Sequence, residues 1–257
     1  MQERPAIAWI DQRSYGALPW HPPERYPELD FLPAATDPAN RIYAGVRSLL
    51  GALGYDAARA GTPDWSPLSD LVRPGGKVVL KPNYVRHYHE RGGSIDVVVT
   101  HAAVLRPLVD YAWKAVGPGG QVIVADAPQY DCDVDALLAA TRLPELLAWY
   151  ADAIGRRVEW RDLRVQFGRH ERGVVVERRA LAGDPEGYEP VDLGSASEFA
   201  RMEPRDVALL RGADYDEEVT IHHHSAGRNE YLVARTVLTA DLVINCLLYT
   251  SDAADEL

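Results

Sequence analysis

Apolar residues in the first half of the chain recur at the spacing of amphipathic helices. One stripe consists of Ile42, Val46, Leu49, Leu50 and Leu53. This spacing predicts a helix that buries one face. Asp37-Pro38 suits its start, because aspartate caps helices and proline fits the first turn, and Gly54 suits its end. A second stripe predicts a helix over residues 105–116, with Pro107 in its first turn or kinking it.

Short apolar runs lie between and beyond these helices and predict buried strands at residues 77–80, 121–125 and 240–245. Their apolar residues are contiguous rather than alternating, as in a parallel sheet that is covered on both faces. Strand, helix and strand in this order favour a right-handed parallel βαβ unit. Residues 158–200 differ, because short β-prone stretches such as residues 174–177 stand between Gly and Pro turns.

These patterns predict an α/β fold. We expect a mostly parallel sheet with flanking helices, an antiparallel excursion, and a sheet that is incomplete at the C-terminus. Residues 1–36 are expected to be irregular, and residues 37–245 to form a single domain with a β-rich insertion at residues 158–218.

Residues 246–257 break this pattern. The run from Cys246 to Glu256 (CLLYTSDAADE) resembles the read-through translation of a transposase sequencing adapter. We therefore expect a foreign tail, which does not belong in fold reasoning, and a natural chain that is truncated near Asn245. The alternative is a short natural tail.

Composition narrows the class of protein. The chain has 257 residues, 47% of them hydrophobic, with two cysteines and a formal net charge of −11. The apolar content argues against disorder, and the cysteine count against a disulfide scaffold. The acidic balance argues against nucleic-acid and anionic-membrane partners. No apolar run approaches the roughly 18 residues of a membrane span, and the N-terminus lacks a signal-peptide pattern, so we expect a cytoplasmic protein.

Polar residues follow two of the predicted strands. Lys81 offers an ammonium group for an anion, and Asn83 an amide that both donates and accepts hydrogen bonds. Asp126 offers a carboxylate for metal binding or base chemistry, and His101 precedes the second helix, whose N-terminus favours anions. Ligands of open α/β sheets lie beyond the carboxyl ends of the strands, so these residues predict a site. The alternative for each is a helix cap or a surface group.

The histidine run at residues 222–224 is a second candidate. In an extended segment alternate residues share a face, so His222 and His224 would bind one metal ion if a carboxylate such as Asp126 joined them. The alternative is a surface loop or substrate-facing histidines. Cys132 alone supports neither a zinc nor an iron–sulfur site within this chain. The P-loop, dinucleotide-binding and nucleophile-elbow motifs are absent from the sequence.

Four segments stand in an order that a known family shares. They are Lys77-Val-Val-Leu-Lys81-Pro82-Asn83, Thr100-His101, Val122-Ile-Val-Ala-Asp126 and Ala240-Asp241-Leu-Val-Ile-Asn245. Their order resembles that of the family called domain of unknown function 362. In that family the segment resembling ADLVIN is followed by a Pro-Lys-Leu-Lys-Thr-His segment, whereas this chain continues with Cys246-Leu247-Leu248.

The resemblance implies that Lys81, Asn83, His101, Asp126 and Asp241 are recurring polar positions. Some family members are joined to ferredoxin-type iron–sulfur modules, which implies redox chemistry. An iron–sulfur cluster would here be carried by a partner or by a missing segment.

Two functions are therefore expected. The leading hypothesis is an enzyme acting on a small anionic substrate, which Lys81, Asn83 and Asp241 bind. Asp126 and His101 would then carry out proton transfer or bind a divalent metal. The alternative is a non-catalytic accessory or electron-transfer partner, whose same face docks a ferredoxin-like protein.

Overall fold

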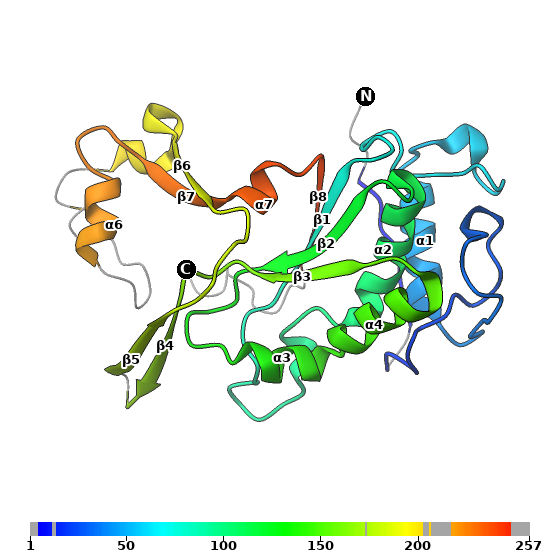
Figure 1. The fold of residues 1–257 in the computed structure, drawn as a ribbon, viewed down its shortest axis with the longest axis horizontal. Helices are drawn as coiled ribbons and strands as arrows, with labels where there is room; N and C mark the ends of the chain where they lie inside the picture. Colours follow the sequence, from blue (N-terminus) through cyan, green and yellow to red (C-terminus); the bar gives the residue numbers. More distant parts are fainter. Residues whose placement is uncertain (1–4, 12–13, 173, 203–205, 207–216, 248–257) are drawn as a thin grey trace. The chain divides into compact units, whose positions relative to one another are not determined.

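The computed structural model describes residues 5–11, 14–172, 174–202, 206 and 217–247 (Figure 1). The chain divides into two compact units. Unit 1 comprises Met1–Asp162 with Ala240–Leu257, and unit 2 comprises Leu163–Thr239.

Unit 1 is built on a four-stranded parallel sheet with the strand order β3-β2-β1-β8. Its elements are η1 (Pro27–Leu29), α1 (Arg41–Ala52), η2 (Ala57–Arg59), β1 (Lys77–Pro82), η3 (Ile95–Val97), α2 (Ala102–Val116), β2 (Gln121–Asp126), α3 (Val134–Thr141), α4 (Leu143–Trp149), the π-helical turn η4 (Tyr150–Ile154), β3 (Val158–Asp162) and β8 (Leu242–Cys246). The predicted parallel unit of β1, α2 and β2 is confirmed, and with it the α/β fold.

The helix starts differ from the expected ones. The N-cap of α1 is Asn40, whose side chain accepts a hydrogen bond from the Tyr43 N–H at 3.0 Å. Asp37 instead accepts from the Ala39 N–H at 3.1 Å, so it shapes the turn before the helix. In α2, Pro107 lies inside the helix rather than in its first turn, where its ring removes one backbone donor.

The core of unit 1 lies between the sheet and α2, with α1 on the far side of α2 (Figure 1). Val78, Leu80 and Val124 from the sheet join Leu105 and Val109 from α2 in one cluster, and all five are fully buried. Burying each such side chain contributes roughly 1.5–3 kcal/mol. This packing fixes the ends of β1 and β2 relative to the start of α2.

A charged network is buried inside this apolar core. Arg106 and Asp110 of α2 form an ion pair in which both side chains are completely buried. The Tyr43 hydroxyl donates to Asp110 Oδ2 at 2.5 Å, and the Tyr150 hydroxyl donates to Oδ1 at 2.7 Å. Arg106 Nε donates to the Pro19 carbonyl oxygen at 3.1 Å. One ion pair thus ties α1, η4 and the N-terminal segment to α2.

Unit 2 consists of two antiparallel strand pairs and short helices, which confirms the predicted antiparallel excursion. Its elements are β4 (Gln166–Glu171), β5 (Val174–Ala180), β6 (Tyr188–Asp192), η5 (Gly194–Ala196), η6 (Glu198–Arg201), α6 (Glu217–His223), β7 (Glu230–Ala234) and α7 (Arg235–Leu238). The insertion begins later than expected, because residues 158–162 form β3 and pair with β2 in unit 1. It also extends to Thr239.

None of the helices that the structure describes is long and apolar enough to cross a bilayer. The segment expected to be a foreign tail lies outside the described residues from position 248 onward. Its first residue, Cys246, ends β8, where it pairs in register with Pro82.

Candidate functional site

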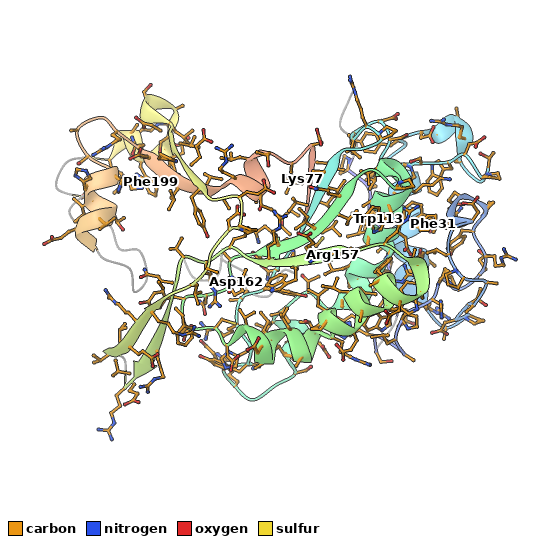
Figure 2. All side chains as sticks on the ribbon, viewed as in Figure 1. Phe31, Lys77, Trp113, Arg157, Asp162 and Phe199 are labelled. Carbon is orange, nitrogen blue, oxygen red and sulfur yellow. The ribbon has the colours of Figure 1, made fainter. Side chains whose placement is uncertain are left out.

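Three strands of unit 1 carry a charged residue at or next to their carboxyl ends, at the same edge of the sheet. Lys81 stands near the end of β1, Asp126 ends β2 and Asp162 ends β3. Figure 2 labels Arg157, just before β3, and Asp162, which marks this carboxyl edge. The strand order reverses between β1 and β8: the chain runs from β1 to β2 and β3 on one side of β1, whereas β8 pairs with β1 on its other side. Ligands of open α/β sheets bind at such a reversal.

Lys81 and Asp126 form an ion pair at this edge, with Lys81 Nζ 3.0 Å from Asp126 Oδ1. The two partners differ in exposure, since the Lys81 side chain is 44% exposed and that of Asp126 only 4%. Lys81 Nζ also donates to the Pro82 carbonyl oxygen at 3.2 Å. The ammonium group is therefore held from the protein side and reaches solvent on the other.

Asp126 is surrounded by donors. Its Oδ2 accepts from the Tyr84 N–H at 2.7 Å, and its Oδ1 accepts from the Ala127 N–H at 2.9 Å. Burial raises the pKa of Asp126, while the Tyr84 N–H, the Lys81 ammonium and the Ala127 N–H oppose that rise. A buried carboxylate with three donors positions Lys81 and has little surface with which to touch a substrate.

Asn83 lies at the same edge, and Thr100 links it to β8. The Asn83 N–H donates to Thr100 Oγ1 at 3.0 Å, and Thr100 Oγ1 donates to the Cys246 carbonyl oxygen at 2.8 Å. The Thr100 N–H returns a bond to the Asn83 carbonyl oxygen at 3.3 Å. The start of α2 is thereby fixed to the ends of β1 and β8.

The structure does not bring His101 to Asp126. His101 is the N-cap of α2, where its Nδ1 accepts from the Ala103 N–H at 3.1 Å. Its ring stacks on Tyr15, with centroids 3.9 Å apart, and meets the edge of Trp20 at 5.2 Å. Burial lowers the pKa of His101 to about 4, so the ring is neutral near pH 7. The geometry supports a capping role instead of the predicted catalytic one.

Asp241 lies at the opposite edge of the sheet. It precedes β8, and its Oδ2 accepts from the N–H of Lys77, the first residue of β1, at 2.7 Å. At about 3.3 Å per residue, Lys81 stands roughly 13 Å farther along the strand. The grouping of Asp241 with Lys81 and Asn83 is therefore corrected, because a residue before a parallel strand and one after it occupy different edges.

The histidine run is helical rather than extended, since α6 ends at His223. His222 and His224 therefore do not share a face: His222 Nε2 lies 3.0 Å from Arg228 Nη2, whereas His224 Nδ1 lies 3.3 Å from Asn229 Oδ1. The geometry on which the two-histidine metal site depended is absent. Among the residues that the structure describes, no group of three or more His, Cys, Asp or Glu side chains is placed to hold a metal ion.

Two neighbours of Lys81 and Asp126 were not predicted from the sequence. Asp162 pairs in register with Asp126, so two carboxylates end adjacent strands. Burial raises the pKa of the Cys246 thiol to about 12, with Lys81 lowering it and Asp126 raising it. The run Val158-Glu-Trp-Arg-Asp162 repeats the strand-then-aspartate pattern of β2, and this signal was available in the sequence.

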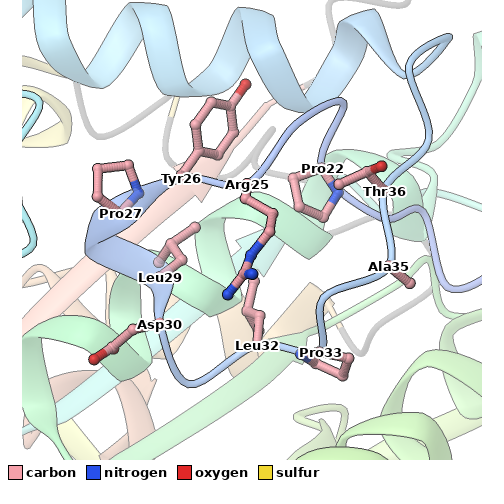
Figure 3. A pocket seen from close by; sticks show the side chains of 10 residues that line it. All are labelled: Pro22, Arg25, Tyr26, Pro27, Leu29, Asp30, Leu32, Pro33, Ala35 and Thr36. Carbon is pink, nitrogen blue, oxygen red and sulfur yellow. The ribbon is translucent and has the colours of Figure 1, made fainter.

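A separate hollow of about 220 Å³ lies in the N-terminal segment of unit 1 (Figure 3). Prolines and leucines make up half of its ten lining residues, and the Arg25 side chain extends across it toward Leu32 (Figure 3). Its charged lining residues, Arg25 and Asp30, are both exposed. We place the candidate site at the sheet edge, where the charged pair is anchored by a buried carboxylate.

Comparisons of the chain with protein-family models, curated proteins and solved structures find no match. The family resemblance, the iron–sulfur cluster and the ferredoxin-like partner stay predictions.

Proposed function

We propose that the protein is an enzyme acting on a small anionic substrate, whose anionic group binds Lys81 at the carboxyl edge of the unit 1 sheet. The observation that carries this proposal is the Lys81–Asp126 ion pair at the ends of β1 and β2, beside the reversal of strand order between β1 and β8. Asp126 is the positioning residue, and Asn83, two residues beyond Lys81, is the neighbouring polar group at this edge.

The donor count of the ammonium group supports this role. Lys81 Nζ has three N–H donors, of which one faces Asp126 and one the Pro82 carbonyl oxygen. The third remains for a carboxylate or phosphate oxygen. A charge-assisted bond of this kind is stronger than a neutral one, and the buried Asp126 limits the freedom that the lysine loses on binding.

Lysine reactivity provides the test, because the chain has only three lysines: Lys77, Lys81 and Lys114. We would acylate the protein with a limiting amount of an amine-reactive reagent, with and without saturating inorganic phosphate or a dicarboxylate. Peptide mass spectrometry would then give the extent of acylation at each lysine. We expect the anion to slow acylation of Lys81 about fivefold or more, as a bound oxygen occupies the ammonium donor. Lys77 and Lys114 serve as internal controls and should react at unchanged rates.

A variant pair extends the test to binding. Anions that stabilise the folded state raise its thermal midpoint; Lys81→Met should abolish this rise, and Lys77→Met, at the amino edge of the same strand, should keep it. Equal anion protection of all three lysines, or a midpoint rise that survives Lys81→Met, would remove Lys81 from the site.

A further inference from the structure

His224, the last residue of the histidine run, lines a cavity in unit 2 that shares no lining residue with the site proposed above. The cavity has a volume of about 500 Å³. Its lining includes Phe199, Met202, Ile221, His224, Arg228 and Asn229. Small-molecule sites typically have volumes of about 300–1,000 Å³, apolar walls and a few fixed polar groups. This cavity has that size and composition.

Aromatic rings form one wall. The His224 ring centroid lies 5.2 Å from that of Phe199 and 5.1 Å from that of Tyr231, with edge-to-face angles of 70° and 71°. Ser197 Oγ lies 2.7 Å from the Tyr231 hydroxyl and fixes that ring. Phe199, labelled in Figure 2, is 40% exposed, so its ring has a surface that a ligand can cover.

A neighbouring amide selects the tautomer of His224. Asn229 Nδ2 donates to the Gly194 carbonyl oxygen at 3.0 Å, so the amide oxygen faces His224 Nδ1 at 3.3 Å. Because an amide oxygen only accepts, Nδ1 carries the hydrogen, and Nε2 of the neutral ring is an acceptor. His224 thus contributes an aromatic ring whose Nδ1 is held by Asn229.

Arg228 supplies a fixed positive charge beside these rings. Its Nη2 donates to the His222 carbonyl oxygen at 3.0 Å and lies 3.0 Å from His222 Nε2. The Glu230 carboxylate lies 2.6 Å from His223 Nδ1 and also forms an ion pair with Arg228, but its distance of 3.8 Å from Nη1 is too long for a direct hydrogen bond. Nη1 therefore keeps donors for a ligand.

We propose that this cavity binds a planar aromatic acid. The ring of the ligand packs against Phe199 and the edge of His224, and its carboxylate or sulfonate accepts hydrogen bonds from Arg228. Aromatic packing and a charge-assisted bond would act together. The histidine run then has a role in ligand binding: His222 orients Arg228, His223 binds the Glu230 carboxylate, and His224 lines the cavity.

Two fluorescent probes that differ in charge test this proposal on the full chain. Anilinonaphthalene sulfonate carries the aromatic rings and the anion, and N-phenylnaphthylamine carries the rings alone. We expect the anionic probe to bind at one saturable site, with Arg228→Gln weakening it about tenfold and leaving the neutral probe within about twofold. Phe199→Leu should weaken both probes about fivefold, because it removes the ring but keeps an apolar side chain.

Arg201→Gln is the matched control. Arg201 belongs to η6, next to the cavity, yet its side chain is 82% exposed and pairs with Glu198 at 3.2 Å. It should leave both probes unchanged. Equal weakening by Arg228→Gln and Arg201→Gln, or no saturable binding of the anionic probe, overturns the proposal. If Phe199→Leu loses its circular dichroism signal, the charge comparison at Arg228 still decides.

Discussion

Lowering the pH from about 8 to about 5 should destabilise the protein through His101. In the folded chain Nδ1 accepts the Ala103 N–H, so a proton there breaks the cap of α2. The proton would also place a positive charge at a helix N-terminus, which is unfavourable. Burial lowers the pKa of His101 to about 4, against 6.5 for a free histidine. Between these values the unfolded chain takes up the proton and the folded chain does not, so the free energy of unfolding falls as the pH falls.

The size of the effect follows from the two pKa values. At about pH 5 the unfolded histidine is almost fully protonated and the folded one about a tenth protonated, which corresponds to a loss of about 2 kcal/mol relative to pH 8. For a domain with a free energy of unfolding of about 5–15 kcal/mol, this loss is readily measured.

His101→Asn isolates this contribution, because asparagine is a good N-cap and does not titrate. We would measure urea unfolding of both proteins by tryptophan fluorescence at about pH 8 and about pH 5. Loss of the stacked ring should make the variant less stable at pH 8, and this deficit should shrink by about 2 kcal/mol at pH 5. His21, whose pKa burial also lowers, is present in both proteins, so its share cancels.

His89→Asn controls for the removal of a histidine as such. His89 Nδ1 also accepts a backbone N–H, that of Arg91 at 3.0 Å, but in a loop. This variant removes a histidine without removing a helix cap, so comparing it with His101→Asn separates the cap of α2 from the loss of a histidine as such. If the free energies of unfolding of the wild type and His101→Asn change with pH in parallel, within about 0.5 kcal/mol, the account of His101 as a neutral, buried cap is wrong.

Two further substitutions test buried charges by urea unfolding. Asp110→Asn leaves the Arg106 guanidinium buried without its counter-charge and should cost about 3–5 kcal/mol; replacing both by apolar residues should recover part of that loss, and no recovery would contradict the ion-pair account. Thr236→Val in unit 2 removes a buried hydroxyl that donates to Asp184 Oδ1 at 2.5 Å, and should cost about 1.5–3 kcal/mol. The exposed Thr239→Val should cost less; equal losses would show that burial of the Asp184 bond is unimportant.

The local sequence patterns predicted which segments form helices and strands better than they predicted the residues at which these begin and end. The apolar stripe that includes Ile42 and Leu50 indicated α1, and the contiguous valines indicated β1 and β2, because these periods follow directly from which face is buried. The cap of α1 was missed because Asp37 and Asn40 both suit an N-cap. Asn40 caps the helix because the chain makes one more turn first, and that turn depends on contacts outside the helix. Asn40 Nδ2, for example, donates to the His21 carbonyl oxygen at 2.9 Å.

The direction of the parallel strands was enough to predict the part of the site that lies at strand ends. Lys81 and Asp126 follow parallel strands, so their meeting at one edge could be predicted from topology. The same rule, applied to Asp241, would have placed it at the other edge, because it precedes its strand. His101 needed information that the sequence lacks: Tyr15 and Trp20, far away along the chain, decide that its ring is buried. The histidine run was likewise misjudged, because α6 extends to His223, and His222 and His224 contact different partners, Arg228 and Asn229.

The two proposed ligand sites can be tested separately, since their residues lie in different units. Both rest on a cation that is held by neighbours before any ligand arrives. Lys81 is held by a carboxylate at 3.0 Å, so its anion competes with Asp126 for the ammonium charge, whereas Arg228 Nη2 is held by a carbonyl oxygen and a ring nitrogen, and the Glu230 carboxylate lies 3.8 Å from Nη1. Added salt should weaken binding at both sites, because each pairs an anion with a cation. Aromatic packing supplies part of the affinity at Arg228, so probe binding there should remain measurable at a salt concentration that abolishes anion protection of Lys81. Parallel salt titrations of lysine protection and of probe binding measure this difference, and loss of both at the same salt concentration would contradict it.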